Sequence, residues 1–330
     1  MNPKISVLIP AYNAEKTILA AVWSALNQDF DGFEVCVYND GSSDKTSDLL
    51  DGIADERLRV FHGDVNKGIV FARNYLLHKT TAPFVAWLDA DDIMLPGRLQ
   101  AQYHYFQQHP KTDVLGGWAV LRRLDLGDWV PGGRMVKISG NPDYLQTSMA
   151  FRNPFIQSGI MARNFFIAEN LLFDSDYEYT EDYELFLRCR DRGKVLAVIQ
   201  TPVVSYFMPG AHGQKEKEAR YNTQQKWARI LSMYFPFTQE DKTAVVLDFL
   251  RSNARLTATN YAFLKDWLGL AEKHLLNKDN RASTGTKAAL LFQWFRLFRL
   301  RFGLVAAAFW LMTRNPIHTI TMLRNRTRIV

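Results

Sequence analysis

Three carboxylates stand within four consecutive positions, at Asp89, Asp91 and Asp92, directly after the apolar run Phe84 to Leu88. Carboxylates this close repel one another unless they are exposed or neutralised, and a divalent cation that prefers oxygen ligands is the natural neutraliser. The alternative is a solvated acidic turn in which Asp91 or Asp92 caps the next helix. The cluster therefore predicts either a cation site or an ordinary turn.

Other polar groups follow apolar runs or open helical stretches. Asp40 comes after the run 33–38, where Asp-Gly-Ser is also ordinary turn chemistry, and Tyr12 follows the run 5–9, as a base-stacking ring or a packing aromatic. Glu181 and Asp182 begin an amphipathic stretch, where acids are favoured by the helix dipole even without a catalytic role. Each of these groups is ambiguous when taken alone.

The elements that must position these groups alternate along the first half of the chain. Short β-rich runs are followed by amphipathic helical stretches, which is typical of β-α-β units and a mostly parallel sheet, with Pro96 in the first turn of the fourth helix. Ligands of such sheets bind beyond the carboxyl ends of the strands. The expected strands are 5–9, 33–38, 58–61 and 84–88, and the expected helices are 15–28, 44–53, 68–78, 96–107 and, later in the chain, 182–190.

The first strand lacks the two common glycine-rich nucleotide loops. Neither Gly-x-Gly-x-x-Gly nor Gly-x4-Gly-Lys-Ser/Thr follows it, which argues against a dinucleotide-dependent oxidoreductase and a P-loop nucleotidase. The residues that follow the strand are Pro10-Ala11-Tyr12-Asn13. Any nucleotide bound there must be held in a different way from these two loops.

Charge is unevenly distributed over the 330 residues. The chain has a net charge of +6, but residues 281–330 hold nine Lys and Arg and no acid, while the first 280 residues hold 31 basic and 34 acidic ones. A near-neutral body with a basic tail does not fit a wholly basic nucleic-acid binder. We therefore expect no nucleic acid among its partners.

The cysteines and the apolar segments indicate the compartment. Cys36 and Cys189 lie far apart in a predicted strand and a predicted helix, which argues against a disulfide and favours a reducing, cytoplasmic setting. No signal-peptide core precedes Pro10. The longest apolar stretch, 302–313, has 12 residues and is too short to cross a bilayer as a helix, so any membrane contact should be peripheral.

Four motifs follow one another along residues 4–120: Ile5-Ser6-Val7-Leu8-Ile9-Pro10-Ala11-Tyr12-Asn13, Asn39-Asp40-Gly41-Ser42-Ser43-Asp44, Asn66-Lys67-Gly68 with Ala72-Arg73-Asn74, and Asp89-Ala90-Asp91-Asp92. In this order they resemble the nucleotide-binding half of a family 2 glycosyltransferase of GT-A fold. A later segment, Thr180 to Leu185, resembles the acceptor-side carboxylate motif of that family, so the resemblance covers about residues 4–212.

This resemblance implies a fold class and a division into domains. The fold is expected to be α/β, a Rossmann-like, mostly parallel sheet flanked by helices, followed by an α-helical C-terminal region. We expect a GT-A catalytic domain at 1–222, with its nucleotide-binding half at 1–120 and its acceptor half at 121–222. The helical, basic region is expected at 223–330.

The resemblance also implies roles for residues at the donor nucleotide. Pro10 and Tyr12 are expected to bind the nucleotide sugar, with Tyr12 against the nucleobase. Asp40 is expected to hydrogen-bond the base or ribose, and Arg73 to lie at the nucleotide near Asp40. These side chains suit such contacts, because a carboxylate can accept from uracil N3–H and a guanidinium can pair with phosphate.

Metal binding and catalysis are implied in the same way. Asp89 and Asp91 match the family's Asp-x-Asp, in which the first acid approaches the ribose and the second holds Mn²⁺ or Mg²⁺ on the diphosphate. Asp92 is expected to support the loop or cap the helix. His212 matches a histidine that completes the metal site in some members, although this chain has Phe207 where the family commonly has Arg.

The acceptor-side motif supplies the expected catalytic group. Asp182 matches the family's general base, which takes a proton from the acceptor hydroxyl as it attacks the anomeric carbon from the face opposite the diphosphate. Glu181 beside it is expected to raise the pKa of Asp182 or to orient it.

The resemblance thus predicts an inverting, metal-dependent transferase that moves one hexosyl or N-acetylhexosaminyl unit from a UDP-sugar to a hydroxyl. The chain lacks Gln-x-x-Arg-Trp and the multiple spans of processive synthases. Two alternatives are a nucleotidyltransferase, which would want a basic glycine-rich loop after the first strand, and a non-catalytic membrane-surface adaptor with a degenerate transferase domain.

The basic tail, Ala288 to Val330, has two interpretations. Leu290, Phe295 and their apolar neighbours recur at helical spacing, which suits a buried core helix, but nine cations without an acid in residues 281–330 suit an in-plane helix at an anionic membrane. The second interpretation predicts a peripheral protein at the cytoplasmic face of the membrane. Its acceptor would be a lipid-linked or membrane-anchored glycan in polysaccharide, lipopolysaccharide or glycoconjugate synthesis.

Overall fold

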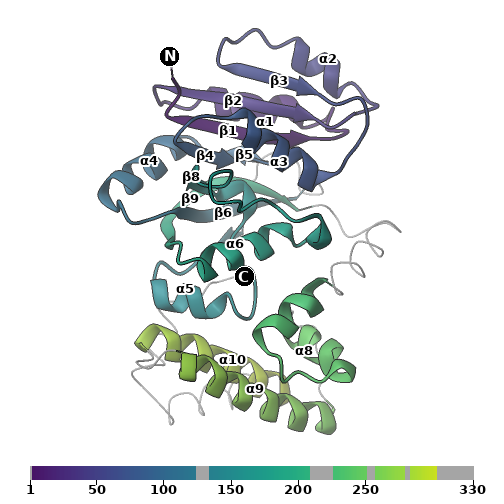
Figure 1. Cartoon of the computed structure of the whole chain (residues 1–330), viewed down its shortest axis with the longest axis vertical. Coiled ribbons are helices and arrows are strands. Elements are labelled where there is room, and N and C mark those ends of the chain that lie inside the picture. The colour runs from purple at the N-terminus through teal and green to yellow at the C-terminus, as the bar shows by residue number, and fades with distance from the viewer. Residues whose placement is uncertain (1, 124–133, 209–225, 251–256, 279–282, 303–330) are drawn as a thin grey trace. The chain divides into compact units, whose positions relative to one another are not determined.

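The computed structural model describes residues 2–123, 134–208, 226–250, 257–278 and 283–302. The chain divides into two compact units. The first contains residues 1–138, 155–212 and 327–330, and the second contains 139–154 and 213–326. Figure 1 shows the sheet of the first unit and the helices of the second.

A nine-stranded, mostly parallel sheet forms the first unit, with strand order β3-β2-β1-β4-β8-β6-β9-β5 and β7 paired to β6. Strands β3, β2, β1 and β4 run parallel, as expected from the β-α-β alternation, and β8 runs antiparallel to both β4 and β6. The strands are β1 (Ile5–Ala11), β2 (Phe33–Asn39), β3 (Leu58–His62), β4 (Phe84–Trp87), β5 (Ile93–Met94), β6 (Val114–Arg123), β7 (Met135–Val136), β8 (Met161–Arg163) and β9 (Leu196–Met208).

Helices flank this sheet where the sequence predicts them. One detail differs, because the fourth helix begins at Arg98 with Gly97 as its N-cap residue at φ +74°, so Pro96 precedes the helix instead of opening it. The helices are α1 (Ile18–Leu26), α2 (Thr46–Asp51), α3 (Ile69–Lys79), α4 (Arg98–Gln108) and α6 (Glu181–Asp191), with short 3₁₀ turns η2 (Gln157–Gly159) and η3 (Ser175–Tyr177).

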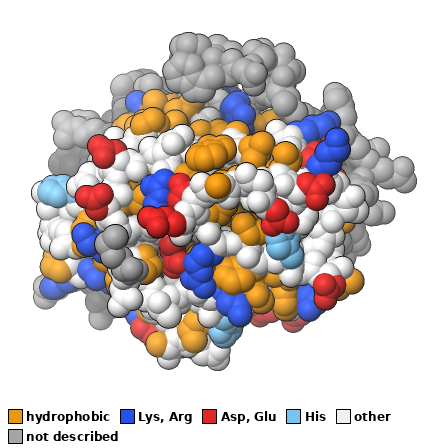
Figure 2. Space-filling model, turned by 90° about the horizontal axis from the view of Figure 1, so that it is seen from above, with side chains coloured by type: hydrophobic (Ala, Val, Ile, Leu, Met, Phe, Trp, Pro, Cys, Tyr) orange, Lys and Arg blue, Asp and Glu red, His pale blue; other side chains and the backbone are white. Residues whose placement is uncertain are grey.

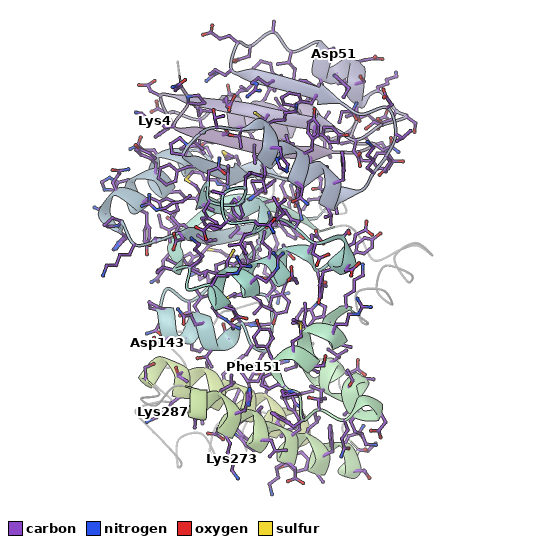
Figure 3. The ribbon with its side chains drawn as sticks, viewed as in Figure 1. Lys4, Asp51, Asp143, Phe151, Lys273 and Lys287 are labelled. Carbon is purple, nitrogen blue, oxygen red and sulfur yellow. The ribbon has the colours of Figure 1, made fainter. Side chains whose placement is uncertain are left out.

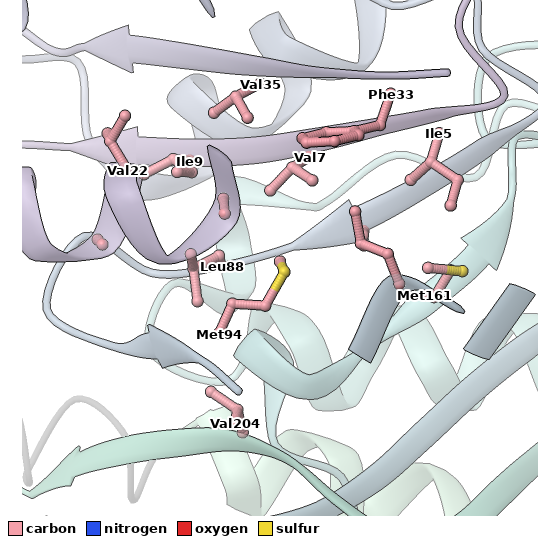
Figure 4. Packing of buried hydrophobic residues seen from close by; sticks show 14 of the residues in the cluster. Ile5, Val7, Ile9, Val22, Phe33, Val35, Leu88, Met94, Met161 and Val204 are labelled. Atoms are coloured by element: carbon pink, nitrogen blue, oxygen red, sulfur yellow. The ribbon is translucent and has the colours of Figure 1, made fainter. Parts of the chain in front are cut away.

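The core of the first unit lies between the sheet and its helices. Ile5, Val7 and Ile9 of β1 are fully buried and pack with side chains of β2, α1 and the segment after β4 (Figure 4). Both cysteines are free and buried, Cys36 in β2 and Cys189 in α6, and burial raises the pKa of each thiol to about 12. On the face seen in Figure 2, acidic and basic side chains are mixed and apolar ones are exposed between them.

The second unit is helical throughout its described residues. Its helices are α5 (Pro142–Ser148), a helix at 226–234, α8 (Thr243–Leu250), α9 (Ala258–Lys278) and α10 (Thr284–Phe302), with a 3₁₀ turn η4 (Glu240–Lys242). Phe151, labelled in Figure 3, lies with its ring 5.5 Å from that of Phe235 in a shared apolar cluster. Thus the segment 139–154, expected within the acceptor half, packs with the C-terminal helices.

Close packing explains this placement of 139–154. Tyr144 of α5 shares a buried cluster with Ala288, Ala289 and Phe295 of α10. A Cβ at Gly285 would lie 2.3 Å from Asn141 Oδ1, so glycine lets the start of α10 approach α5.

Part of the basic tail is core and not membrane surface. Leu290 and Phe295 are buried, and Arg296, only 7% exposed, donates to the carbonyls of Phe249 and Leu250 at 2.7 and 2.8 Å. These three side chains thus belong to the interior of the helical unit, as the core-helix interpretation expects, and the membrane interpretation of the tail stays a prediction. Residues 303–330 lie outside the described residues. Among the helices that the structure describes, none combines the length and apolarity needed to span a bilayer.

Candidate active site

Asp40 stands at the end of β2 and holds the start of α3. Its carboxylate accepts the backbone N–H of Lys67 at 3.0 and 3.1 Å and that of Gly68 at 2.8 Å. Gly68 precedes the helix at φ +89°, a conformation that favours glycine. The N-terminus of a helix is electropositive, so the negative charge of Asp40 is stabilised there. The Asp40 side chain is 97% buried, with only 3% of its surface exposed.

The end of β1 carries an accessible ring beside Asp40. Pro10 is buried within β1, opposite Tyr38 of β2, whereas Tyr12 just beyond the strand is 49% exposed. Asn13, at φ +48°, ties this turn to the one after β2, because its Oδ1 accepts the backbone N–H of Ser43 at 2.9 Å. An exposed ring held at a strand end is suited to stacking on a planar base.

The acidic loop after β4 is fixed at both ends. The backbone N–H of Asp89 donates to Ser158 Oγ at 2.9 Å, and Asp92 Oδ1 accepts the backbone N–H of Phe207 in β9 at 2.6 Å. Asp92 is fully buried, and burial together with the charges of Asp89 and Asp91 raises its pKa to about 8. Burial and the charge of Asp89 also raise the pKa of Asp91 to about 6.

Arg73 joins this loop to the start of α6. Its guanidinium donates to Asp89 Oδ1 at 3.0 Å and to Glu181 Oε1 at 2.5 Å, and it lies 5.4 Å from the Phe173 ring centroid. Burial lowers the pKa of Arg73, but the carboxylates of Asp89, Glu181 and Asp182 outweigh this and leave it raised. Arg73 is therefore a fixed cation between the two acidic segments.

Asp182, in the first turn of α6, belongs to the same electrostatic cluster. Its pKa is raised to about 6 by burial and by the charge of Glu181, against the lowering effect of Arg73, and Asp89 raises it further. Glu181 is 94% buried, with 6% exposed. A carboxylate with a pKa just below neutrality is ionised at pH 7 yet basic enough to take a proton.

Several buried polar atoms at this site lack a hydrogen-bond partner. They are Arg73 Nε, Asp92 Oδ2, Arg122 Nε, Glu181 Oε2 and both amide atoms of Gln157. Folded proteins leave few such atoms, and a bound water or ligand is the usual partner. Three of these residues, Arg73, Asp92 and Glu181, belong to the acidic loop and to the ion pairs around it.

Some residues at the site escaped the sequence analysis. Arg122, at the end of β6, donates to the carbonyl of Asp91 at 2.7 Å, and its guanidinium lies 5.5 Å from the Phe207 ring centroid. The sequence feature that could have predicted it is the basic pair Arg122-Arg123 at the end of a strand. Ser158, which binds the Asp89 backbone, and Tyr206, whose pKa is raised by burial and by the surrounding carboxylates, carried none.

The oxygen donors at the β4 end suit Mg²⁺ or Mn²⁺. Among the described residues, no group of three or more His, Cys, Asp or Glu side chains is arranged to hold a metal ion by itself. Mg²⁺ sites that act on phosphates commonly use one or two carboxylates and complete the shell with substrate phosphates and water. Asp91, with Asp89 beside it, fits that form, and His212 lies outside the described residues.

Comparisons with known proteins agree on the family. The profile described as "Glycosyl transferase family 2" matches residues 6–172. An uncharacterized glycosyltransferase of Haemophilus influenzae is 30% identical over 191 residues, which are 57% of this chain and 72% of that protein. A "UDP-Glc:alpha-D-GlcNAc-diphosphoundecaprenol beta-1,3-glucosyltransferase" of Escherichia coli is 32% identical over 117 residues, 36% of this chain and 46% of that one.

Solved structures support the fold. The crystal structure of Staphylococcus aureus TarS 1-349 in complex with UDP-GlcNAc has a TM-score of 0.57 at 18% identity, covering 92% of this chain and 89% of that one. Among the first curated relatives, the matched segments span from 27% to 72% of the relative's own length. The profile match over half of the chain and the sheet that carries its motifs lead to one conclusion: this chain belongs to glycosyltransferase family 2, with a GT-A fold.

Proposed function

We propose that the protein is an inverting transferase that moves one hexosyl or N-acetylhexosaminyl unit from a UDP-sugar to a hydroxyl of a lipid-linked glycan. One observation carries this proposal. Asp182, with its pKa raised to about 6, shares the charge of Arg73 with Asp89 at the end of β4. A base and a diphosphate-side acid in one cluster are what a single displacement at an anomeric carbon requires.

Relatives and structural neighbours support the choice of donor and acceptor. Two Escherichia coli relatives are named as enzymes that use UDP-Glc and a diphosphoundecaprenol-linked GlcNAc, and the TarS crystals contain UDP or UDP-GlcNAc. A further Escherichia coli relative is described as "Putative colanic acid biosynthesis glycosyl transferase WcaA". We infer a uridine donor and a role in cell-surface polysaccharide or lipopolysaccharide synthesis.

The mechanism assigns each charged group a task. Asp182 takes the proton of the acceptor hydroxyl while the oxygen attacks the anomeric carbon, and the bond to the diphosphate breaks on the opposite face. Tyr12 stacks on the base, and Asp40 fixes the loop that borders the nucleotide. Mn²⁺ or Mg²⁺ held at Asp91 and Asp89 would supply positive charge to the diphosphate leaving group. Arg73 fixes the position of Asp89 relative to the start of α6 through its two ion pairs.

A panel of nucleotide sugars tests the reaction. The purified protein, supplied with Mn²⁺, should release UDP from one or more of UDP-glucose, UDP-galactose and UDP-N-acetylglucosamine, and should not release GDP from the corresponding GDP-sugars. Asp182→Asn is the matched inactive control. Release from no donor, by a protein that still binds UDP, would favour the adaptor alternative and refute the transferase proposal.

The stereochemistry provides a separate test. Direct displacement inverts the anomeric configuration, so the product of an α-linked donor should carry a β linkage. Proton NMR of the anomeric position in the product reads this configuration. A retained α linkage would exclude the single-displacement mechanism while leaving donor use intact.

We also propose that the protein works at the cytoplasmic face of a membrane, where a lipid-linked acceptor is presented. The support is the sequence of residues 303–330, which holds four Arg and no acid. Each basic residue near an anionic surface contributes about 1 kcal/mol to binding. Replacing Arg324, Arg326 and Arg328 by Gln in the full chain should abolish most salt-sensitive sedimentation with phosphatidylglycerol vesicles. Unchanged sedimentation would contradict the proposal.

A further inference from the structure

Gln157 is a buried amide without a partner. It opens the 3₁₀ turn η2 and is 94% buried, yet neither its Nε2 nor its Oε1 has a hydrogen-bond partner. Two unsatisfied groups on one buried side chain are costly, because both lose water and gain nothing. An apolar residue would pack here without that cost, so a buried glutamine without protein partners is a candidate for binding a ligand.

The turn that carries Gln157 is held rigidly between the two acidic segments. On one side, Ser158 Oγ accepts the backbone N–H of Asp89 at 2.9 Å. On the other, the ring of Phe155 lies 5.1 Å from that of Phe186 in α6, the helix whose first turn holds Asp182. Gln157 therefore lies in a turn that Ser158 links to the end of β4 and that Phe155 links to α6.

Arg98 fixes the backbone of this turn. The Arg98 guanidinium, 99% buried, donates to the carbonyls of Ser158 at 2.5 Å and of Ile160 and Trp87 at 3.0 Å. A side chain on so firmly held a backbone is preorganised, so little entropy is lost when a ligand binds it.

The sheet order indicates which part of a donor this amide would meet. Tyr12 and Asp40 follow β1 and β2, whereas η2 leads into β8, which lies on the opposite side of β4. The base and ribose are expected on the β1 and β2 side. The transferred sugar is expected between the diphosphate at Asp89 and Asp91 and the proton acceptor Asp182, and the neighbours of Gln157, Ser158 and Phe155, contact the two segments that carry these acids.

We propose that Gln157 recognises a hydroxyl of the transferred sugar and so helps to set donor specificity. An amide suits this task, because its N–H₂ donates to a hydroxyl oxygen while its C=O accepts from the same or the neighbouring hydroxyl. Sites that hydrogen-bond a substrate hydroxyl discriminate strongly against analogues that lack it, since the buried partner is then left unpaired. This inference rests on the proposed transferase function.

The test replaces Gln157 by Met, which has the same length and no hydrogen-bonding amide. The Gln157→Met protein should bind UDP as the wild type does, whereas kcat/KM for release of UDP from the best UDP-sugar should fall about 10- to 100-fold, the loss expected for one or two hydrogen bonds. Gln157→Asn, which withdraws the amide by one carbon, should show the same selective loss and guards against misfolding of the first variant.

A matched control is available in Gln28. It is buried to the same extent, but its amide is satisfied by the carbonyls of Ser24 and Leu95 and by the backbone N–H of Leu99. Gln28→Met should therefore lower the Tm by several degrees and leave the preference for the sugar unchanged. Gln157→Met should leave the Tm unchanged or raise it, because two unpaired buried groups are removed.

Deoxy analogues of the best donor identify the hydroxyl. The analogue that lacks the hydroxyl bound by Gln157 should lose the same factor with the wild type and nothing further with Gln157→Met. If the variant keeps the wild-type kcat/KM and the wild-type ranking of analogues, Gln157 binds only internal water or the acceptor, and the inference is wrong. A wild type that binds no uridine nucleotide would instead overturn the proposed function itself.

Discussion

Asp40 and Asp182 are both buried or partly buried acids that follow strands of one sheet or begin a helix beside it, and their charges are compensated to different degrees. Asp40 receives three contacts from two backbone N–H groups at the N-terminus of α3. Asp182 accepts one backbone N–H, that of Tyr183 at 2.6 Å, and lies in a cluster with Asp89 and Glu181 near the cation Arg73. The first carboxylate is neutralised by the fold, whereas the second belongs to a cluster with more negative than positive charge.

This difference separates groups that build the site from groups that react in it. A carboxylate bound by backbone amides at a helix N-terminus is stabilised in its charged form and holds two segments together. Crowded carboxylates with raised pKa values carry an electrostatic cost that a cation, a ligand or a proton can relieve. The raised pKa values of Asp91, Asp92 and Asp182 therefore mark the reactive side of the sheet.

The largest expected effect comes from Asp182→Asn. The amide keeps the shape of the side chain and removes the proton acceptor, so turnover should fall by about 10²- to 10⁴-fold while UDP affinity survives. Steady-state transfer assays and calorimetry with UDP measure the two quantities. Asp176→Asn is the matched control, because Asp176 is an exposed acid shortly before α6 and its loss should leave turnover unchanged. More than about a tenth of wild-type transfer in Asp182→Asn would rule out its role as the base.

Asp91→Asn should uncouple nucleotide binding from the metal. Wild-type UDP affinity is expected to rise on addition of Mn²⁺, and the variant should lose at least the roughly 10- to 100-fold that even an outer-shell change costs in metal affinity. Calorimetry in Mn²⁺ and in EDTA compares the two proteins, with the exposed Asp29→Asn as a control. Equal UDP affinity with and without Mn²⁺ in the wild type would contradict the metal role of Asp91.

The pH dependence of transfer should follow Asp182. A base must be deprotonated to act, and a pKa of about 6 means that kcat falls about tenfold per pH unit below that value and is level above it. Because Asp91 also has a pKa raised to about 6, the profile is measured at saturating donor and Mn²⁺. The residual activity of Asp182→Asn should not fall below pH 6 in this way. If the same fall in kcat persists in the variant, another group causes it.

The sequence predicted the elements of the first unit because local signals and the fold agree there. Apolar runs such as 5–9 and 84–88 became β1 and β4, and the polar residues that follow them meet at one side of the sheet, as parallel strands require. Motif order then distinguished a transferase from other α/β enzymes. No local signal, however, shows that Arg73 would bind Asp89 and Glu181, 108 positions apart in the case of Glu181.

Other features depend on contacts that a single sequence does not display. The segment 139–154 was assigned to the acceptor half by its position in the chain, but Asn141 and Tyr144 pack against α10 through the small residue Gly285. Arg296 could not be placed from the sequence either. A charged residue among aromatic ones suggests an exposed helix face, whereas in the structure two backbone carbonyls accept hydrogen bonds from its buried guanidinium. Gln157 could not be identified from the sequence, because only the structure shows that its amide is buried without a hydrogen-bond partner.

The smallest expected effect concerns stability and tests the opening comparison directly. Asp40→Asn replaces one acceptor oxygen by a donor that faces backbone N–H groups, so the free energy of unfolding should fall by about 1–2 kcal/mol. Asp182→Asn should raise it at pH 7. The folded pKa of Asp182, about 6, exceeds the ordinary value near 3.9, so the folded state binds more protons between these pH values and the charged form opposes folding above them. Amide hydrogen exchange in β1 and β4, measured at increasing urea concentrations, gives the free energy of unfolding of the unit that contains both residues. The same substitution should thus act with opposite sign at the two sites, and a shift in the same direction would show that both acids are held alike.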